Sequence, residues 1–192
     1  DAMVHAIEAY TSIHKKNPYS DMLSREALKL MSQNIETAVR HGDNLDARQN
    51  MLLGACLAGQ AFANAPVAAV HALAYPLGGH FHIPHGLSNS LVLPEVLKYN
   101  AAAASNEYAE IYDVIMPGNN GGDSEEKTAL LIKYLENLIE RLGLPTKLRD
   151  AGVTEQSLTT LASDAMLQQR LLINNPKEVT ETDALAIYRA AF

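Results

Sequence analysis

Residues 71–86 read HALAYPLGGHFHIPHG. This stretch contains four of the seven histidines of the chain: His71, His80, His82 and His85. Alanine and leucine around His71 predict a buried helix that carries this histidine and ends near Pro76 to Gly79. Pro84 fixes φ and lacks an amide donor, so we expect His85 at the start of the next helix.

So many histidines in one stretch suggest a transition metal, because neutral imidazole is the commonest protein ligand for such ions. Asp1 and His5 open the chain, and their i,i+4 spacing places both side chains on one helix face. Together these residues predict a divalent metal held by one carboxylate and three imidazoles, from Asp1, His5, His71 and His85. The competing interpretation treats each histidine as a solvated or hydrogen-bonded core residue, which is the commoner case for a single histidine.

Several separated blocks of the sequence, in the right order, resemble one known family. Asp1-x-x-x-His5, HALAYPLGG from His71, IPHGLSNSLVLP from Ile83 and LGLPTKLRDAGV from Leu142 look like the iron-containing (group III) alcohol dehydrogenases. The resemblance covers essentially the whole chain. It implies an all-α, multi-helix domain of the dehydroquinate synthase-like type, and it implies that Asp1, His5, His71 and His85 hold the metal.

The resemblance also implies the cofactors and the partners. Fe²⁺ is the usual metal of the family, Zn²⁺ occurs in the related glycerol dehydrogenases, and NAD or NADP carries the hydride. Full-length members have an N-terminal nucleotide-binding domain with a Gly-rich phosphate loop. The Gly cluster Gly118–Gly122 has no preceding strand, so we interpret it as a plain loop. We therefore expect residues 1–192 to be the single helical metal-binding domain of a longer, homo-oligomeric chain.

The position four residues after His71 departs from the family pattern, because Tyr75 replaces the usual histidine near the nicotinamide. Tyr75 faces the same way as His71. Its hydroxyl is predicted to bind the substrate or the nicotinamide ribose, and the alternative is a packed aromatic whose hydroxyl is satisfied. His85 is the second residue predicted to contact the cofactor.

Four further side chains are candidates for the substrate pocket. Phe62 and Asn64 lie just before the helix of His71, which brings them within reach of a pocket there. His80 and His82 flank Phe81, and they either line the pocket, replace a ligand, or are simply solvated. We expect Phe62 and His82 to contact the substrate. His14, beside two lysines, and His41, near a helix end, are interpreted as surface residues.

Composition limits the functional classes and the cellular compartment that are compatible with this chain. The net charge of −7 argues against nucleic-acid binding, which relies on a basic face, and no apolar run approaches a membrane span. We see no signal peptide. Cys56 is the only cysteine, so no intrachain disulfide is possible and a reducing, cytoplasmic compartment fits. Its apolar surroundings, MLLGACLAG, predict a buried thiol.

Periodicity along the chain predicts helices throughout, with no central strand and no repeat. Apolar spacing, caps and breakers place about eight to ten helices over residues 1–14, 20–41, 45–63, 86–100, 101–116, 125–142, 154–170 and 180–192, besides the helix of His71. Pro94 should kink or break its helix, and Thr180-x-x-Asp183 resembles a capping box.

A divalent metal bound by three neutral imidazoles and one carboxylate keeps a charge of about +1, which suits it to polarise an alcohol or carbonyl oxygen. Together with this chemistry, the resemblance to the iron-containing alcohol dehydrogenases implies reversible hydride transfer between a small primary or secondary alcohol and NAD(P). Two alternatives stay open: a glycerol dehydrogenase- or dehydroquinate synthase-like metalloenzyme, and a non-catalytic metal-binding domain. The 192 residues alone are expected to be inactive, because no segment offers a strand, Gly-rich turn and helix start for a dinucleotide.

Overall fold

The computed structural model describes residues 1–118 and 121–192, and every regular element in these ranges is helical. The α-helices of these ranges are α1 (Ala2–Thr11), α2 (Pro18–Arg40), α3 (Leu45–Asn64), α4 (Ala69–Phe81), α5 (His85–Asn100), α6 (Ser105–Ile115), α7 (Ser124–Arg141), α8 (Leu158–Ala165), α9 (Gln169–Leu172) and α10 (Glu181–Ala191). Two 3₁₀ helices, Leu148–Ala151 and Glu155–Ser157, precede α8. The predicted all-α class is confirmed, as is the expected number of helices.

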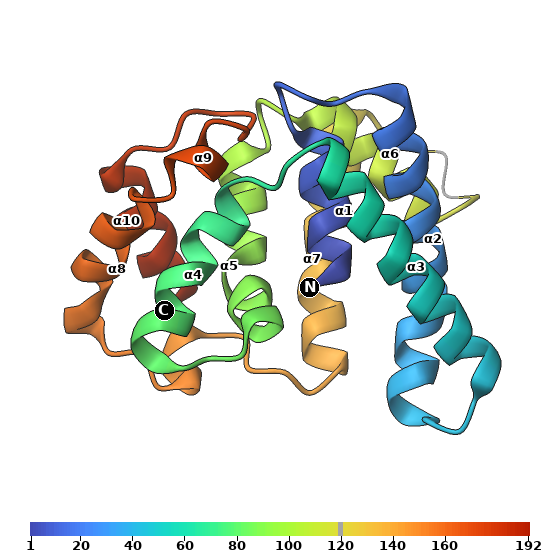
Figure 1. Cartoon of the computed structure of the whole chain (residues 1–192), viewed down its shortest axis with the longest axis horizontal. Coiled ribbons are helices and arrows are strands. Elements are labelled where there is room, and N and C mark those ends of the chain that lie inside the picture. The colour runs from blue at the N-terminus through green and yellow to red at the C-terminus, as the bar shows by residue number, and fades with distance from the viewer. Residues whose placement is uncertain (119–120) are drawn as a thin grey trace.

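Helices α4 and α5 pack against each other in the middle of the molecule, and the remaining helices surround them (Figure 1). On one side α2 and α3 form a long hairpin that packs against α1. On the other side α8 packs on α4 and α10 packs on α5. One apolar core runs through α1, α4, α5, α6, α7, α8 and α10, so burial along nearly the whole chain fixes these helices relative to one another.

Side-chain caps explain where three of the helices begin. Asn17 and Asp123 each form a capping box with the third residue of α2 and of α7. Thr180 does the same with Asp183 at α10, as the sequence predicted. Each box satisfies backbone N–H groups that the first helical turn leaves without a partner. Such a cap stabilises a helix by typically about 1 kcal/mol.

The prediction that the helix of His71 ends near Pro76 to Gly79 is wrong. Helix α4 continues through Pro76 and both glycines to Phe81, and it ends where His82 adopts a left-handed conformation with φ of 53°. The buried residues Leu73 and Leu77 lie on both sides of Pro76, so packing outweighs the local cost of the proline. The start of α5 at His85, directly after Pro84, is as predicted.

Other predicted helix boundaries also differ from the observed ones. Residues 154–170 were expected to form one helix, but the structure divides them into a 3₁₀ turn, α8 and the start of α9. The first helix ends at Thr11 rather than at residue 14. Pro94 lies inside α5 without breaking it. The predicted Gly118–Gly122 loop falls partly on residues 119 and 120, which lie outside the described ranges.

The prediction that Cys56 is buried is wrong, because its thiol lies on the exposed face of α3. The buried face of this helix is formed by small residues, among them Gly54 and Ala58, which lie against α2 and the core. Both faces of α3 carry apolar residues, so apolar character alone did not reveal which one is covered. Cys56 Sγ instead receives a contact from Gln60 Nε2 of its own helix at 3.5 Å.

No single helix among residues 1–118 and 121–192 is both long and apolar enough to cross a membrane. Helices α3 and α4 meet the length and composition criteria only as a pair, and the chain bends by 107° between them.

Candidate metal centre

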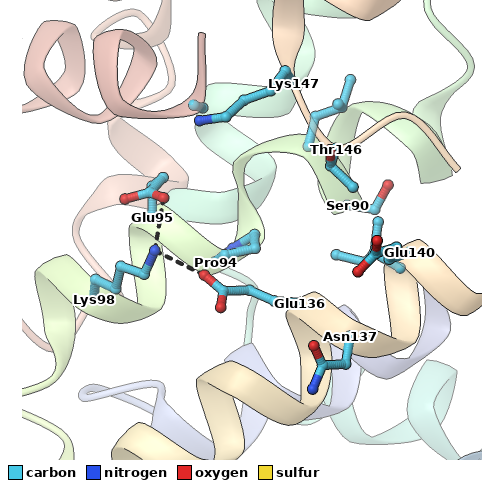
Figure 2. Close-up of a pocket in the computed structure, with 12 residues that line it drawn as sticks. Ser90, Pro94, Glu95, Lys98, Glu136, Asn137, Glu140, Thr146 and Lys147 are labelled. Carbon is cyan, nitrogen blue, oxygen red and sulfur yellow. Dashed lines mark hydrogen bonds and ion pairs between the residues drawn. The ribbon is translucent and has the colours of Figure 1, made fainter.

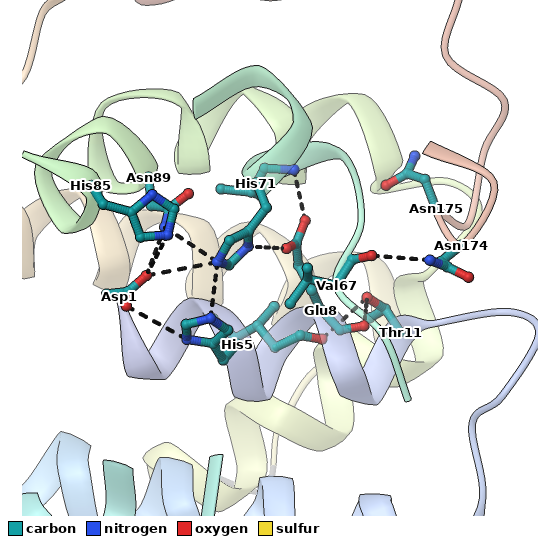
Figure 3. Close-up of polar contacts among 12 residues, drawn as sticks. Asp1, His5, Glu8, Thr11, Val67, His71, His85, Asn89, Asn174 and Asn175 are labelled. Atoms are coloured by element: carbon teal, nitrogen blue, oxygen red, sulfur yellow. Dashed lines mark hydrogen bonds and ion pairs between the residues drawn. The ribbon is translucent and has the colours of Figure 1, made fainter. Parts of the chain in front are cut away.

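The four predicted ligands come together where α1, α4 and α5 meet (Figure 3). Asp1 is the N-cap residue of α1, and His5 lies one turn later on the same face. His71 is buried in the first turn of α4, and His85 is the first residue of α5. Residues that are up to 84 positions apart in the sequence therefore lie together in the structure.

The distances between the ligand atoms suit one small cation. Nε2 of His71 lies 3.1 Å from Nε2 of His5 and 3.7 Å from Oδ1 of Asp1. Nε2 of His85 lies 3.5 Å from the same Asp1 oxygen. Four ligands at about 2.0–2.2 Å around a tetrahedral metal stand about 3.3–3.6 Å apart, and the observed separations bracket this range.

Three of the ligands form a tighter group than the fourth. The ligand atoms of Asp1, His5 and His71 all lie within 4.8 Å of one another. His85 reaches this group from the more open side, since 45% of its side chain is exposed. The group is thus closed toward the core and accessible beside His85, which leaves one side on which a small molecule can approach.

The electrostatics favour neutral imidazoles with free lone pairs. Burial, together with the neighbouring His71 ring, lowers the pKa of His5 to about 4. Burial also lowers the pKa of His85. A proton on either ring is therefore disfavoured at neutral pH, and a neutral imidazole is the form that binds a metal. Two imidazole nitrogens only 3.1 Å apart must share a proton or a cation, so the donor set fits a divalent metal.

Two residues of the site were missed by the sequence analysis. Oε2 of Glu8 lies 2.6 Å from Nδ1 of His71, and Glu8 is only 3% exposed. The amide Nδ2 of Asn89 donates to Oδ1 of Asp1 at 2.7 Å and lies 3.3 Å from Nε2 of both His71 and His85. Helical spacing could have revealed both, because Glu8 follows His5 by three residues and Asn89 follows His85 by four.

Aromatic side chains flank the centre. Phe62, near the end of α3, stacks on the ring of His5 with 4.4 Å between the ring centroids. The ring of Tyr75 lies 5.8 Å from that of His85 and is 37% exposed. Its hydroxyl has no hydrogen-bond partner among the described residues, and the role of Tyr75 stays a prediction.

The remaining candidates lie away from the centre. Nε2 of His80 lies 2.5 Å from Oδ2 of Asp164, which ties α4 to α8. His82 caps the end of α4 with an exposed side chain, and no described residue pairs with that side chain. Asn64 is exposed and donates to the carbonyl of Gln60 in its own helix at 2.8 Å. The geometry thus links Phe62 and Tyr75 to the centre, but not these three residues.

A second group of charged residues lines a cavity of about 390 Å³ beside Pro94, here called the Lys98 cavity (Figure 2). Nζ of Lys98 lies 2.9 Å from a carboxylate oxygen of Glu95 and 2.8 Å from one of Glu136. Nζ of Lys147 donates to the carbonyl of Ala190 at 2.8 Å. Both lysines of the cavity are therefore engaged within the chain, and none of the predicted metal ligands lines it.

Comparison with known proteins agrees with this architecture. The chain is 43% identical to the long-chain-alcohol dehydrogenase 1 of Geobacillus thermodenitrificans and 37% identical to the 1,3-propanediol dehydrogenase of Citrobacter freundii. It aligns over its whole length and covers 48% and 49% of these relatives. A crystal structure of a 1,3-propanediol oxidoreductase superposes on the whole chain with a TM-score of 0.95 and 36% identity, and the chain covers 50% of it.

The chain thus spans about half the length of the relatives it matches. The family model described as "Fe-containing alcohol dehydrogenase family, C-terminal" matches residues 1–192. The match to the family model and the fold shared with a solved member lead to the same conclusion. The chain belongs to the iron-containing alcohol dehydrogenase family and corresponds to its C-terminal part.

Proposed function

We propose that the protein is a metal-dependent alcohol dehydrogenase that transfers hydride reversibly between an alcohol and NAD or NADP. The observation that carries this proposal is the group formed by Asp1, His5 and His71, whose ligand atoms all lie within 4.8 Å of one another, with Nε2 of His85 3.5 Å from the Asp1 carboxylate. The named activities of the relatives support the same reaction class, because they include long-chain alcohol and 1,3-propanediol dehydrogenases.

The four ligands would hold Fe²⁺, or Zn²⁺ as the alternative, since both ions accept imidazole and carboxylate donors. A bound divalent ion would act there as a Lewis acid toward the alcohol or carbonyl oxygen. The chain itself prepares this position by keeping the imidazoles of His5 and His85 neutral and by holding the Asp1 carboxylate through Asn89. These contacts fix the donors before any substrate arrives.

Phe62 and Tyr75 would form the two aromatic sides of the substrate pocket. Phe62 covers His5 by stacking on its ring, which excludes water from that side of the centre. Tyr75 and His85 lie together at the accessible side, where the Tyr75 hydroxyl is free to donate to a substrate oxygen or to the nicotinamide ribose. The pocket proposed here uses Phe62, Tyr75 and His85, whereas the exposed His82 is not needed for it.

The nicotinamide nucleotide would be bound mainly by residues outside this chain. Within the described ranges no strand, Gly-rich turn and helix start form the unit that holds a pyrophosphate. Hydride transfer requires donor and acceptor to be held about 3–3.5 Å apart in an aligned geometry. Residues 1–192 alone should therefore give no NAD(P)-dependent oxidation, and we retain a homo-oligomer of the longer protein as a prediction.

The test is a steady-state assay of the full-length protein loaded with Fe²⁺ or Zn²⁺, using straight-chain primary alcohols and 1,3-propanediol with NAD and with NADP. Cofactor reduction is expected, and Tyr75→Phe should lower turnover while metal content stays unchanged. Tyr75→His should retain activity. Bound metal without cofactor reduction by any alcohol would instead indicate a non-catalytic metal-binding domain, and metal loss in Tyr75→Phe would contradict the placement of this residue.

A further inference from the structure

Glu8 connects α1 to α4 through both of its carboxylate oxygens (Figure 3). Oε1 accepts the backbone N–H of Val70 at 2.6 Å, and Oε2 lies 2.6 Å from Nδ1 of His71. The N-cap residue of α4, Ala68, has no side chain that can cap the helix. Glu8 thus supplies from a distant helix the acceptor that the first turn of α4 would otherwise lack.

The environment of Glu8 makes its charge costly unless something balances it. The side chain is buried, and no lysine or arginine of the described residues pairs with it. Burying a carboxylate without a compensating charge is strongly unfavourable. The hydrogen bonds from Val70 and His71 supply only part of the compensation. A divalent ion bound on the other side of the His71 ring would supply a full positive charge close to this carboxylate.

We propose that Glu8 is a positioning residue for the metal, an inference that rests on the metal-dependent function proposed above. Its carboxylate accepts the Nδ1 proton of His71, so the lone pair on Nε2 points toward Asp1 and His5. A carboxylate behind a ligating imidazole fixes the tautomer and the ring orientation and makes the nitrogen a stronger donor.

The same residue changes the charge of the centre. Asp1 and Glu8 together bring two negative charges, which balance a divalent ion that three neutral imidazoles help to hold. The charge of about +1 obtained from the four ligands alone becomes about zero when Glu8 is included. Glu8 is therefore expected to increase the affinity for a divalent ion rather than to contact the substrate.

Glu8→Gln is the sharpest variant, because glutamine keeps the size of the side chain but offers only one acceptor oxygen. Either Val70 N–H or His71 Nδ1–H then faces the amide NH₂ group. The matched control is Tyr188→Phe. It removes the buried hydrogen bond of 2.5 Å from the Tyr188 hydroxyl to the carbonyl of Leu73, which also lies on α4, without touching Glu8 or His71.

The experiment measures Zn²⁺ affinity of the purified protein by competition with a chelator, and the visible spectrum of the Co²⁺-loaded protein. Loss of a partner behind a metal ligand typically weakens binding by about 10–100-fold. Glu8→Gln should show a loss of this size together with a changed Co²⁺ spectrum, whereas Tyr188→Phe should keep both close to wild type. Equal affinity and spectra for Glu8→Gln and wild type would overturn the inference, as would an equal loss in both variants.

A wild-type protein that binds no divalent metal would instead refute the proposed metal-dependent function. This result can be distinguished from a failure of the positioning role of Glu8, in which wild type binds metal and Glu8→Gln binds it equally well. A second measurement covers the case in which Glu8→Gln does not fold. Nitrogen NMR of the metal-free wild-type protein should show His71 with its proton on Nδ1. A proton on Nε2 would contradict the positioning role, whatever the variants do.

Discussion

Two clusters of acidic and basic side chains, the metal centre and the Lys98 cavity, differ in what balances their charge. In the Lys98 cavity the ammonium of Lys98 lies between Glu95 and Glu136, so the chain supplies its own cation (Figure 2). In the metal centre no lysine or arginine of the described residues pairs with Asp1 or Glu8, and two of the three imidazoles are held neutral by burial (Figure 3).

Burial determines how much this difference in charge balance costs in free energy. The Lys98 side chain is 46% exposed, so water screens its ion pairs and they contribute little to stability. Glu8 and His71 are almost fully buried, where an unbalanced charge is costly. A cluster of charged residues therefore indicates a ligand when its own charges do not cancel and part of the cluster is buried.

The largest expected effect comes from removing a ligand at the accessible side of the centre. His85→Ala takes away one of three imidazoles without leaving a buried charge unpaired, so the protein should fold. Metal affinity should fall by more than the roughly 10–100-fold that partners behind a ligand typically contribute. Metal analysis after dialysis would measure this, with His14→Ala as the exposed control that keeps its metal. Equal occupancy in both variants would remove His85 from the site.

A smaller effect on metal affinity is expected from a substitution at Gly86, where α5 approaches Asp1. A Cβ added at Gly86 would lie 3.3 Å from Cβ of Asp1, closer than most such contacts. Gly86→Ala should therefore displace the carboxylate and weaken metal binding by about tenfold, which corresponds to about 1.4 kcal/mol.

The control for this variant is Gly79→Ala, where the added Cβ has no neighbour within 4 Å. That substitution, inside α4, should leave metal affinity unchanged and raise the free energy of unfolding by about 0.4–1 kcal/mol. Chelator competition and chemical denaturation would separate the two glycines. Unchanged affinity in Gly86→Ala would show that Asp1 tolerates the closer approach of α5.

The smallest effect is expected in the Lys98 cavity. Lys98→Met leaves Glu95 and Glu136 without their cation, but both pairs are solvated, so the free energy of unfolding should change by less than about 1 kcal/mol. Metal affinity should stay at the wild-type value. Thermal unfolding and metal titration would check both statements, and a loss of bound metal in this variant would mean that the two charge clusters are not independent.

The sequence alone pointed to Asp1, His5, His71 and His85 as ligands. Helical spacing and the resemblance to a known family both indicate these positions. Asp1 and His5 share a helix face by spacing alone, and His71 and His85 belong to blocks that resemble the family. Glu8 also follows the helical spacing, but a glutamate on a helix is usually solvated. Its role depends on how α1 crosses the start of α4, and that crossing is a property of the packed core.

The incorrect predictions for the end of α4 and for the burial of Cys56 have the same physical origin. Pro76 and Gly79 carry local signals that normally end a helix, yet buried leucines on both sides keep α4 intact. Cys56 lies in an apolar segment, yet the covered face of α3 is the one formed by its smallest residues. In each case tertiary packing, which local patterns do not encode, determined the outcome.

Asp1, His5, His71 and His85 are proposed to hold one divalent metal per chain. Anomalous X-ray scattering at the iron or zinc absorption edge, recorded from crystals of the metal-loaded protein, tests it most directly. We expect one anomalous peak per chain, about 2.0–2.2 Å from a carboxylate oxygen of Asp1 and from Nε2 of the three histidines. A loaded protein whose only peak lies elsewhere, or whose centre shows no peak, would contradict it.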